Sequence, residues 1–253
     1  MTALLEVSGL SKAFGGVRAV QEVSFAVEPG ELLAMIGPNG AGKTTCFNML
    51  MGQIRPDRGA VRLKGRDIAG LPPHRIWRLG VGRTFQITAT FSSMTVRENV
   101  QMALISHRHA SRRLWRPAAA TEVAQADALL ERVGMAEQGD RACSVLAYGD
   151  LKRVELAIAL ANDPELLLMD EPTAGMAPRE RVELMRLADE IVAERNIGVL
   201  FTEHDMDVVF AHAHRIMVLN RGELIAEGAP EAVRANEQVR EIYLGSAVAE
   251  GAP

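Results

Sequence analysis

One stretch of eight residues limits what this chain can fold into more than any other. Residues 37–44 have the sequence Gly-Pro-Asn-Gly-Ala-Gly-Lys-Thr, which matches the phosphate-binding pattern G-x-x-x-x-G-K-[ST] at every fixed position. An apolar run of strand length, residues 32–36, precedes it, and a segment with helical spacing follows and ends at Gly52. This context favours a phosphate site over a chance glycine-rich turn, because inward-pointing N–H groups and a helix N-terminus attract anions.

The motif also predicts which side chains meet the phosphates. Lys43 is expected to reach the β- and γ-phosphates of a nucleotide, and the Thr44 hydroxyl is expected to ligate Mg²⁺. The candidate nucleotide-binding residues of this stretch are Gly37, Pro38, Asn39, Gly40, Ala41, Gly42, Lys43, Thr44 and Thr45.

Length and composition narrow the class of protein. The 253 residues suffice for one α/β domain with an appended lobe, and a formal net charge of −4 gives no reason to expect a nucleic-acid surface. Cys46 and Cys143 lack metal-ligand spacing and are predicted to be small buried thiols. No run approaches the ~18 apolar residues of a membrane span, and the N-terminal residues do not resemble a secretory signal. Any role at a membrane would therefore depend on a partner.

The first part of the chain predicts short strands. Phe14 is followed by Gly15-Gly16, which places an aromatic side chain on a flexible turn. Gln86 follows the last of the strands, which are predicted at 4–7, 23–27, 61–63 and 81–85.

The middle of the chain predicts helices instead. Thr95 and Glu98 form a capping box, with the threonine as N-cap and the glutamate three residues later. Another helix is expected to start near Asp150. We therefore predict a helical insertion at residues 87–162 within a single domain that spans residues 1–253.

The α/β pattern then resumes. Residues 166–169 and 198–201 are apolar runs, as expected of central parallel strands that are buried on both faces. Residues 215–219 and 223–226 are predicted to form a hairpin. A helix is predicted over 178–195, with an inward face made of Val182, Met185, Ala188, Ile191 and Val192.

Two carboxylates follow the first of these buried strands. Asp170 is placed to hold Mg²⁺ through its water shell, as in other phosphate-loop sites. Glu171 comes next and can project toward the γ-phosphate, where it would polarise the attacking water as a general base. The alternative is a solvated Asp-Glu loop, which the buried strand and the upstream phosphate motif disfavour.

Together these motifs resemble the nucleotide-binding subunits of ATP-binding-cassette transporters, over nearly the whole chain. The resemblance implies that ATP is the nucleotide, that Phe14 stacks on adenine, and that His204 in Thr-Glu-His-Asp is the switch histidine that senses the γ-phosphate. It also implies that Gln86 in Arg-Thr-Phe-Gln contacts Mg²⁺ and the attacking water and moves with the transmembrane partner. The implied fold is a phosphate-loop NTPase core of the α/β class, with a mostly parallel sheet, an N-terminal antiparallel β subdomain and an inserted helical subdomain.

The signature sequence of this family departs from its usual form. The family sequence Leu-Ser-Gly-Gly-Gln is here Leu-Ala-Tyr-Gly-Asp at 146–150, so Tyr148 and Gly149 are left as the candidate nucleotide contacts across a dimer. Ala147 replaces a serine hydroxyl, and Asp150 would place a carboxylate near phosphate unless it serves as the helix N-cap. Ala177 also stands where the family usually has aspartate, so a regulatory cassette with weak hydrolysis is one alternative.

With these departures, the sequence motifs of the chain resemble those of one of the two paired ATPase subunits of branched-chain amino-acid importers. That resemblance implies permease subunits, a second ATPase subunit in a homo- or heterodimer, and, indirectly, a periplasmic or extracellular solute-binding protein. It implies a peripheral location on the cytoplasmic face of the inner membrane. The rival hypothesis is a soluble, non-transport member of the family, although such proteins usually carry two cassettes or a long coiled-coil insertion.

A basic segment at 107–116 gathers four arginines around Trp115. It is either an edge that faces lipid headgroups or the permease, or a solvated loop. We favour the solvated loop, because runs of charge usually lie on solvated surfaces.

Overall fold

Two β-sheets organise the chain. The computed structural model describes residues 3–84, 90–107 and 122–242. The larger sheet has six strands in the order β10-β9-β3-β8-β7-β6, and the smaller has four in the order β2-β1-β4-β5. The larger sheet contains β3 (Leu32–Ile36), β6 (Val81–Thr84), β7 (Leu166–Asp170), β8 (Gly198–Thr202), β9 (Arg215–Asn220) and β10 (Glu223–Gly228). The smaller sheet contains β1 (Leu5–Phe14), β2 (Val17–Val27), β4 (Arg58–Leu63) and β5 (Arg66–Asp67).

The pairing within the larger sheet is mostly parallel. Strands β9, β3, β8, β7 and β6 run parallel to their neighbours, and only the edge strand β10 is antiparallel to β9. The carboxyl ends of these parallel strands therefore share one edge of the sheet, where ligands of open α/β sheets bind. The phosphate motif follows β3 at this edge, and Asp170 at the end of β7 is in register with Thr202 at the end of β8.

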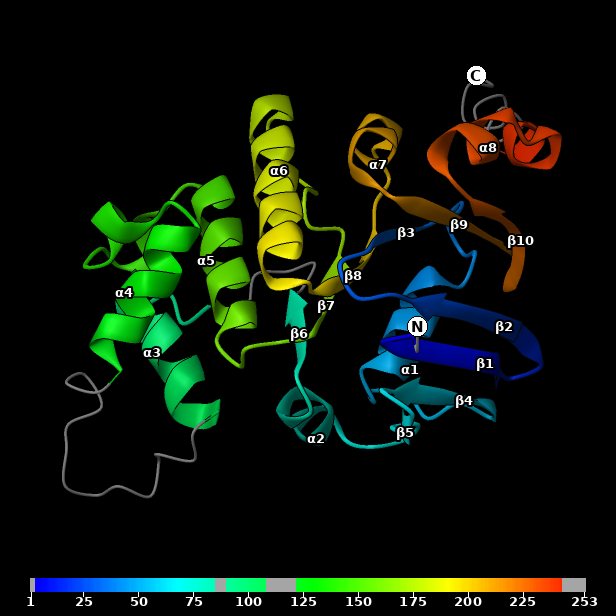
Figure 1. Ribbon diagram of the computed structural model, residues 1–253, viewed down its shortest axis with the longest axis horizontal. Helices are drawn as coiled ribbons and strands as arrows, with labels where there is room; N and C mark the ends of the chain where they lie inside the picture. The colour runs from blue at the N-terminus through cyan, green and yellow to red at the C-terminus, as the bar shows by residue number, and fades with distance from the viewer. Residues whose placement is uncertain (1–2, 85–89, 108–121, 243–253) are drawn as a thin grey trace.

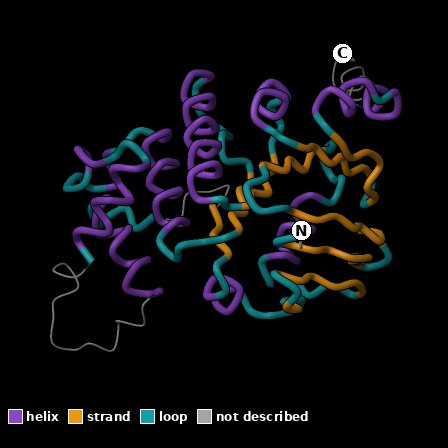
Figure 2. Tube along the Cα trace, viewed as in Figure 1, coloured by secondary structure: helices purple, strands orange, loops and turns teal. Residues whose placement is uncertain are grey.

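Three of the helices gather at one end of the molecule, and the others lie along the sheets (Figure 1). Figure 1 shows α3, α4 and α5 gathered at one end, with α8 and β10 at the other, and Figure 2 shows the separation of helix-rich and strand-rich parts. Helix α1 lies between the larger sheet and the antiparallel sheet. The helices are α1 (Lys43–Leu50), α2 (Pro73–Arg78), α3 (Val96–His107), α4 (Val123–Arg132), α5 (Tyr148–Leu160), α6 (Pro178–Arg195), α7 (Met206–His212) and α8 (Pro230–Ala235).

The residues of β3 divide the interior into two cores. Leu33 and Met35 pack into a core with α1 and the antiparallel sheet, whereas the alternate residues of the strand pack into a core with α3–α8. This division follows from the period-2 alternation of side chains along a strand. Since both faces of β3 are covered, its five residues are all buried and apolar, as the sequence predicted for a central strand.

The predicted fold class is confirmed, with differences in detail. Strands β1 and β2 continue through polar segments to the turn at Gly15-Gly16, because they pair as an antiparallel ladder that resumes after each of its register shifts and ends at Phe14 and Val17. The capping box is confirmed, since Thr95 N donates to Glu98 at 2.8 Å and Glu98 N donates to Thr95 Oγ1 at 3.2 Å. The predicted inward position of Val182 is wrong, because its side chain is 53% exposed. At 100° per residue, Val182 lies roughly 120° around α6 from the middle of the buried face.

Some predictions lie outside the described residues. Gln86 and most of the basic segment 107–116 are among them, so their predicted roles stay predictions. The division of the chain into one domain with an inserted subdomain at 87–162 also stays a prediction, although α3, α4 and α5 do pack against one another. Within the part of the chain that the structure describes, no helix is long and apolar enough to cross a membrane.

Candidate functional site

The phosphate motif forms a tight loop between β3 and α1. Gly37, Gly40 and Gly42 have φ values of 153°, 78° and 104°, which β-carbon-bearing residues rarely adopt. The N–H of Ala41 donates to the carbonyl of Pro38 at 3.1 Å, which closes the turn. Thr44 is exposed in the first turn of α1, so its hydroxyl is open to a ligand.

Lys43 bonds to its own loop. Its side chain is buried, and Nζ donates to the carbonyls of Gly37 at 2.6 Å and Pro38 at 3.2 Å. Burial lowers the pKa of Lys43 from its ordinary value, and the negative charges of Glu171 and Asp170 partly offset this. The ammonium group therefore stands inside the loop and in the field of both carboxylates.

The backbone of two other segments supports the loop from behind. A β-carbon at Gly42 would clash with the carbonyl oxygen of Ala19 on β2, and one at Gly37 would clash with that of Leu219 on β9. The β9–β10 turn adds a hydrogen bond of 2.9 Å from the N–H of Gly222 to the carbonyl of Ala41. The loop thus fits only glycine at these positions, for reasons of space as well as of φ.

Asp170, Glu171 and His204 lie at or just beyond the ends of β7 and β8. His204 Nε2 lies 2.8 Å from Glu171 Oε1. Glu171 has a φ of 49°, and its N–H bonds to the carbonyl of Thr202 at 3.2 Å and to Oγ1 of the same residue at 3.0 Å. This left-handed turn, held by Thr202, directs the side chain of Glu171 toward the histidine.

Asp170 is the candidate metal ligand of this cluster. Its carboxylate is buried, accepts a hydrogen bond from Thr202 Oγ1 at 2.9 Å and lies 3.7 Å from Arg83. Burial lowers the pKa of Arg83, and the charge of Asp170 opposes that change. A buried carboxylate at the strand edge and the exposed Thr44 hydroxyl are hard oxygen donors, and such a donor set fits Mg²⁺.

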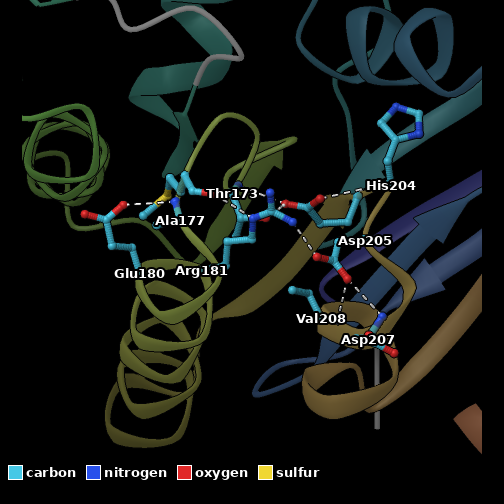
Figure 3. Close-up of polar contacts among 10 residues, drawn as sticks. Thr173, Ala177, Glu180, Arg181, His204, Asp205, Asp207 and Val208 are labelled. Carbon is cyan, nitrogen blue, oxygen red and sulfur yellow. Dashed lines mark hydrogen bonds and ion pairs between the residues drawn. The ribbon is translucent and has the colours of Figure 1, made fainter.

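A buried pair, Thr173 and Glu203, is bonded to the backbone of His204. Glu203 is 4% exposed, and its Oε1 accepts from the N–H of Thr173 at 2.8 Å and from Thr173 Oγ1 at 2.6 Å. Its other oxygen accepts from the N–H of His204 at 3.1 Å. Figure 3 shows Thr173 and His204 together with the first turns of α6 and α7.

The signature residues lie at the start of α5. The helix begins at Tyr148 with Ala147 as its N-cap, so Asp150 lies in the first turn of α5 and is not the N-cap. The ring of Tyr148, which is 40% exposed, lies against Gly175. Gly149 is buried, and a β-carbon there would lie 3.0 Å from the Glu180 carboxylate.

Phe14 ends β1, where the sequence predicted an aromatic residue on a turn. The side chain is 47% exposed, and Lys12 Nζ lies 5.5 Å from its ring centroid. An exposed ring at this position remains open to a flat ligand such as a base.

Several residues of the site escaped prediction from the sequence. Thr173, Glu203 and Arg181 act through contacts between distant segments, for which a single sequence carries no signal. Asp205 did carry a sequence signal, because aspartate directly before a helical segment is a favoured N-cap. In the structure its Oδ1 accepts from the N–H groups of Asp207 at 3.1 Å and Val208 at 3.3 Å.

Comparisons with known proteins agree with this geometry. Residues 20–174 match the family described as ABC transporter, and residues 223–253 match the family described as branched-chain amino acid ATP-binding cassette transporter. The structure superposes on that of an ATP-binding cassette of an ABC transporter in its ADP conformation, with a TM-score of 0.87, 31% identity, and coverage of 97% of this chain and 100% of the other. A nucleotide-free cassette gives a TM-score of 0.86 at 31% identity, covering 96% of this chain and 99% of the other.

Curated relatives align over nearly their whole length. The chain is 42% identical to the high-affinity branched-chain amino acid transport ATP-binding protein BraF of Pseudomonas aeruginosa, over 96% of this chain and 98% of BraF. It is 38% identical to a probable LivG protein of Archaeoglobus fulgidus, over 96% of each chain. The chain therefore belongs to the ATP-binding-cassette family, as an ATP-binding and ATP-hydrolysing subunit of ABC transporters.

Proposed function

We propose that this chain energises the import of branched-chain or related amino acids through a membrane permease. The names of its relatives and the match of residues 223–253 to the branched-chain amino acid class support this solute class. The rival of a soluble, non-transport cassette has no such support, because the curated relatives quoted above are transport proteins. The observation that carries the hydrolytic part is the 2.8 Å contact between Glu171 and His204, beside the buried Asp170.

The proposed division of labour follows the geometry. Lys43 neutralises charge on the β- and γ-phosphates, exchanging its bonds to the loop carbonyls for bonds to phosphate oxygens. Glu171 is the general base for the attacking water, and His204 holds Glu171 and contacts the γ-phosphate. Phe14 stacks on adenine.

Mg²⁺ is the proposed cofactor. Thr44 and Asp170 would hold it, with Gln86 as a further ligand from outside the described residues. When bound, the ion supplies positive charge to the phosphate oxygens. The contribution of Asp170 is a fixed carboxylate, held by Thr202 and flanked by Arg83 so that it does not turn away.

The proposed assembly is a dimer of ATPase subunits on the cytoplasmic face of the membrane. Tyr148, exposed at the start of α5, would face the nucleotide of the partner subunit, with the backbone of Gly149 behind it. Permease subunits would contact the dimer near Gln86, and a solute-binding protein would act on the opposite side of the membrane. Ala147 and Ala177 leave the backbone as the main donor at that interface.

Glu171→Gln tests the catalytic assignment. It removes the base but keeps the shape, so we expect kcat for ATP hydrolysis to fall by at least about 100-fold while ATP affinity is retained. Its counterpart is Lys43→Ala, which should weaken ATP affinity by about 10- to 100-fold, since charge-assisted hydrogen bonds are lost. Near-normal turnover by Glu171→Gln would remove Glu171 from the base role.

Reconstitution tests the solute class. The chain is combined in vesicles with candidate permease subunits and a candidate partner ATPase from the same genome, and ATP hydrolysis is measured with solute-binding protein loaded with leucine, isoleucine or valine. We expect stimulation by at least one of these and none by an unrelated sugar. Stimulation by another solute class alone would contradict the amino-acid assignment without affecting that of Glu171.

A further inference from the structure

The first turn of α6 is tied to the turn that carries the switch histidine. Arg181 Nε donates to the carbonyl of Met176 at 2.8 Å, and its NH1 group donates to Asp205 Oδ2 at 2.6 Å. One planar side chain therefore joins the loop after β7 to the residue that follows His204, as Figure 3 shows. The planar guanidinium presents its donors in a fixed fork, whereas a lysine presents all of its donors from one flexible ammonium group.

Asp205 uses its two oxygens for different partners. Oδ1 caps α7 through the N–H groups of Asp207 and Val208, while Oδ2 faces Arg181. Burial raises the pKa of Asp205, but the hydrogen bonds from Arg181 and the α7 backbone outweigh it and hold the pKa below its ordinary value. Asp205 is therefore a carboxylate at neutral pH, fixed between two elements.

A second connection between these segments involves Glu203, the residue before His204. The buried Thr173–Glu203 pair joins the same loop after β7 to the N–H of His204. Glu203 is thus bonded directly to Thr173, and Asp205 is linked to Met176 through Arg181. No polar contact to His204 itself, other than those of Glu171 and Glu203, is found among the described residues.

We propose that Arg181 is a positioning residue for ATP hydrolysis, which holds the His204 turn in register with the loop at 174–177. The inference rests on the proposed roles of Glu171 and His204 and adds the residue that sets their separation. Since His204 is 49% exposed at its side chain, packing alone does not fix it, and the bonds of its neighbours do. A misplacement of about 1 Å at a reacting centre costs on the order of 100-fold in rate.

Arg181→Met tests the proposal, because it keeps the apolar stem and removes both donors. We expect kcat for ATP hydrolysis to fall by about 10- to 100-fold. The Kd for a non-hydrolysable ATP analogue should stay within about twofold, since no contact with the nucleotide is removed. Arg181→Lys should recover part of kcat, because it restores the charge opposite Asp205 but not the fixed spacing of the two guanidinium donors.

Arg179→Met is the matched control. Arg179 lies two residues earlier in the same turn of α6, is 91% exposed at its side chain and pairs with Glu183 at 3.0 Å. Its removal should leave kcat unchanged.

Asp205→Asn tests the bond between Arg181 and Asp205 by changing the acceptor. Asparagine keeps an oxygen for the α7 cap and loses the charge that faces Arg181. It should lower kcat as Arg181→Met does, and the double variant should be no slower than the slower single variant.

The outcomes separate this inference from the proposed function. An active wild-type protein with a fully active Arg181→Met variant would overturn the positioning role alone. Loss of nucleotide affinity in step with kcat would also overturn it, since Arg181 would then act on binding or folding. A wild-type protein that does not hydrolyse ATP would contradict the proposed function and this inference together.

Discussion

The phosphate loop, residues 37–44, and the turn at residues 202–205 around His204, here called the switch region, lie at the same sheet edge. They are built in different ways. The loop is shaped by glycine and backbone: Gly37 and Gly42 lie against carbonyl oxygens of β9 and β2. The switch region is held by side chains that cross between segments, as in the Arg181–Asp205 and Thr173–Glu203 pairs.

This difference matches the tasks of the two regions. A backbone cradle has few alternative arrangements, so it can hold the same phosphate geometry throughout a cycle. Side-chain pairs between loops can break and form again, because each contributes only a few kcal/mol. We therefore expect substitutions in the loop to act through sterics and those in the switch region through lost partners.

The largest loss of stability is expected at Gly42, where the phosphate loop packs against the backbone of β2. Gly42→Ala meets the carbonyl oxygen of Ala19 and keeps a φ of 104°, so we expect a loss of about 2–4 kcal/mol in the free energy of unfolding. Urea unfolding measures it.

Gly40→Ala is the matched variant for that measurement. Gly40 has a φ of 78° but nothing within 4 Å of an added β-carbon, so only the backbone strain of about 1 kcal/mol should remain. Equal losses for the two alanines would show that space behind the loop does not matter.

A smaller effect is expected for the buried pair of the switch region. Thr173→Val keeps the shape but removes the 2.6 Å bond to Glu203, so we expect a loss of about 1.5–3 kcal/mol in the free energy of unfolding. Thr173→Ser keeps the hydroxyl and should lose less. If serine proved as harmful as valine, the methyl group and not the bond would be the stabilising part.

The smallest effect is expected far from both regions, at the start of α3. Thr95→Ala removes the bond from the Glu98 N–H to Thr95 Oγ1 and should cost about 1 kcal/mol. Thr95→Ser should be close to wild type, and ATP turnover should not change in either. A change in ATP turnover would mean that α3 is coupled to the phosphate loop or the switch region, which we do not expect.

The sequence was informative where structure depends on local pattern. The phosphate motif, the buried strands before Asp170 and Thr202, and the Thr95 capping box all follow from residues within a few positions of one another. The start of α5 was predicted only approximately, near Asp150, because its N-cap Ala147 has no capping side chain to mark it. Arg181 went unnoticed, because its partner Asp205 is 24 residues away and is brought near only by the pairing of β7 with β8.

The β9–β10 turn has a consequence for comparing and recombining members of this family. Gly222 bonds to Ala41 of the phosphate loop, and the N–H of Gln21 on β2 donates to the carbonyl of Gly222 at 2.7 Å. The C-terminal family match begins one residue later, at Glu223. A chimera that takes the C-terminal segment from a relative should therefore keep residues 220–222 with the recipient's own β2 and phosphate loop. If the junction lay further upstream, the donor's own β9–β10 turn would pack against the recipient's phosphate loop.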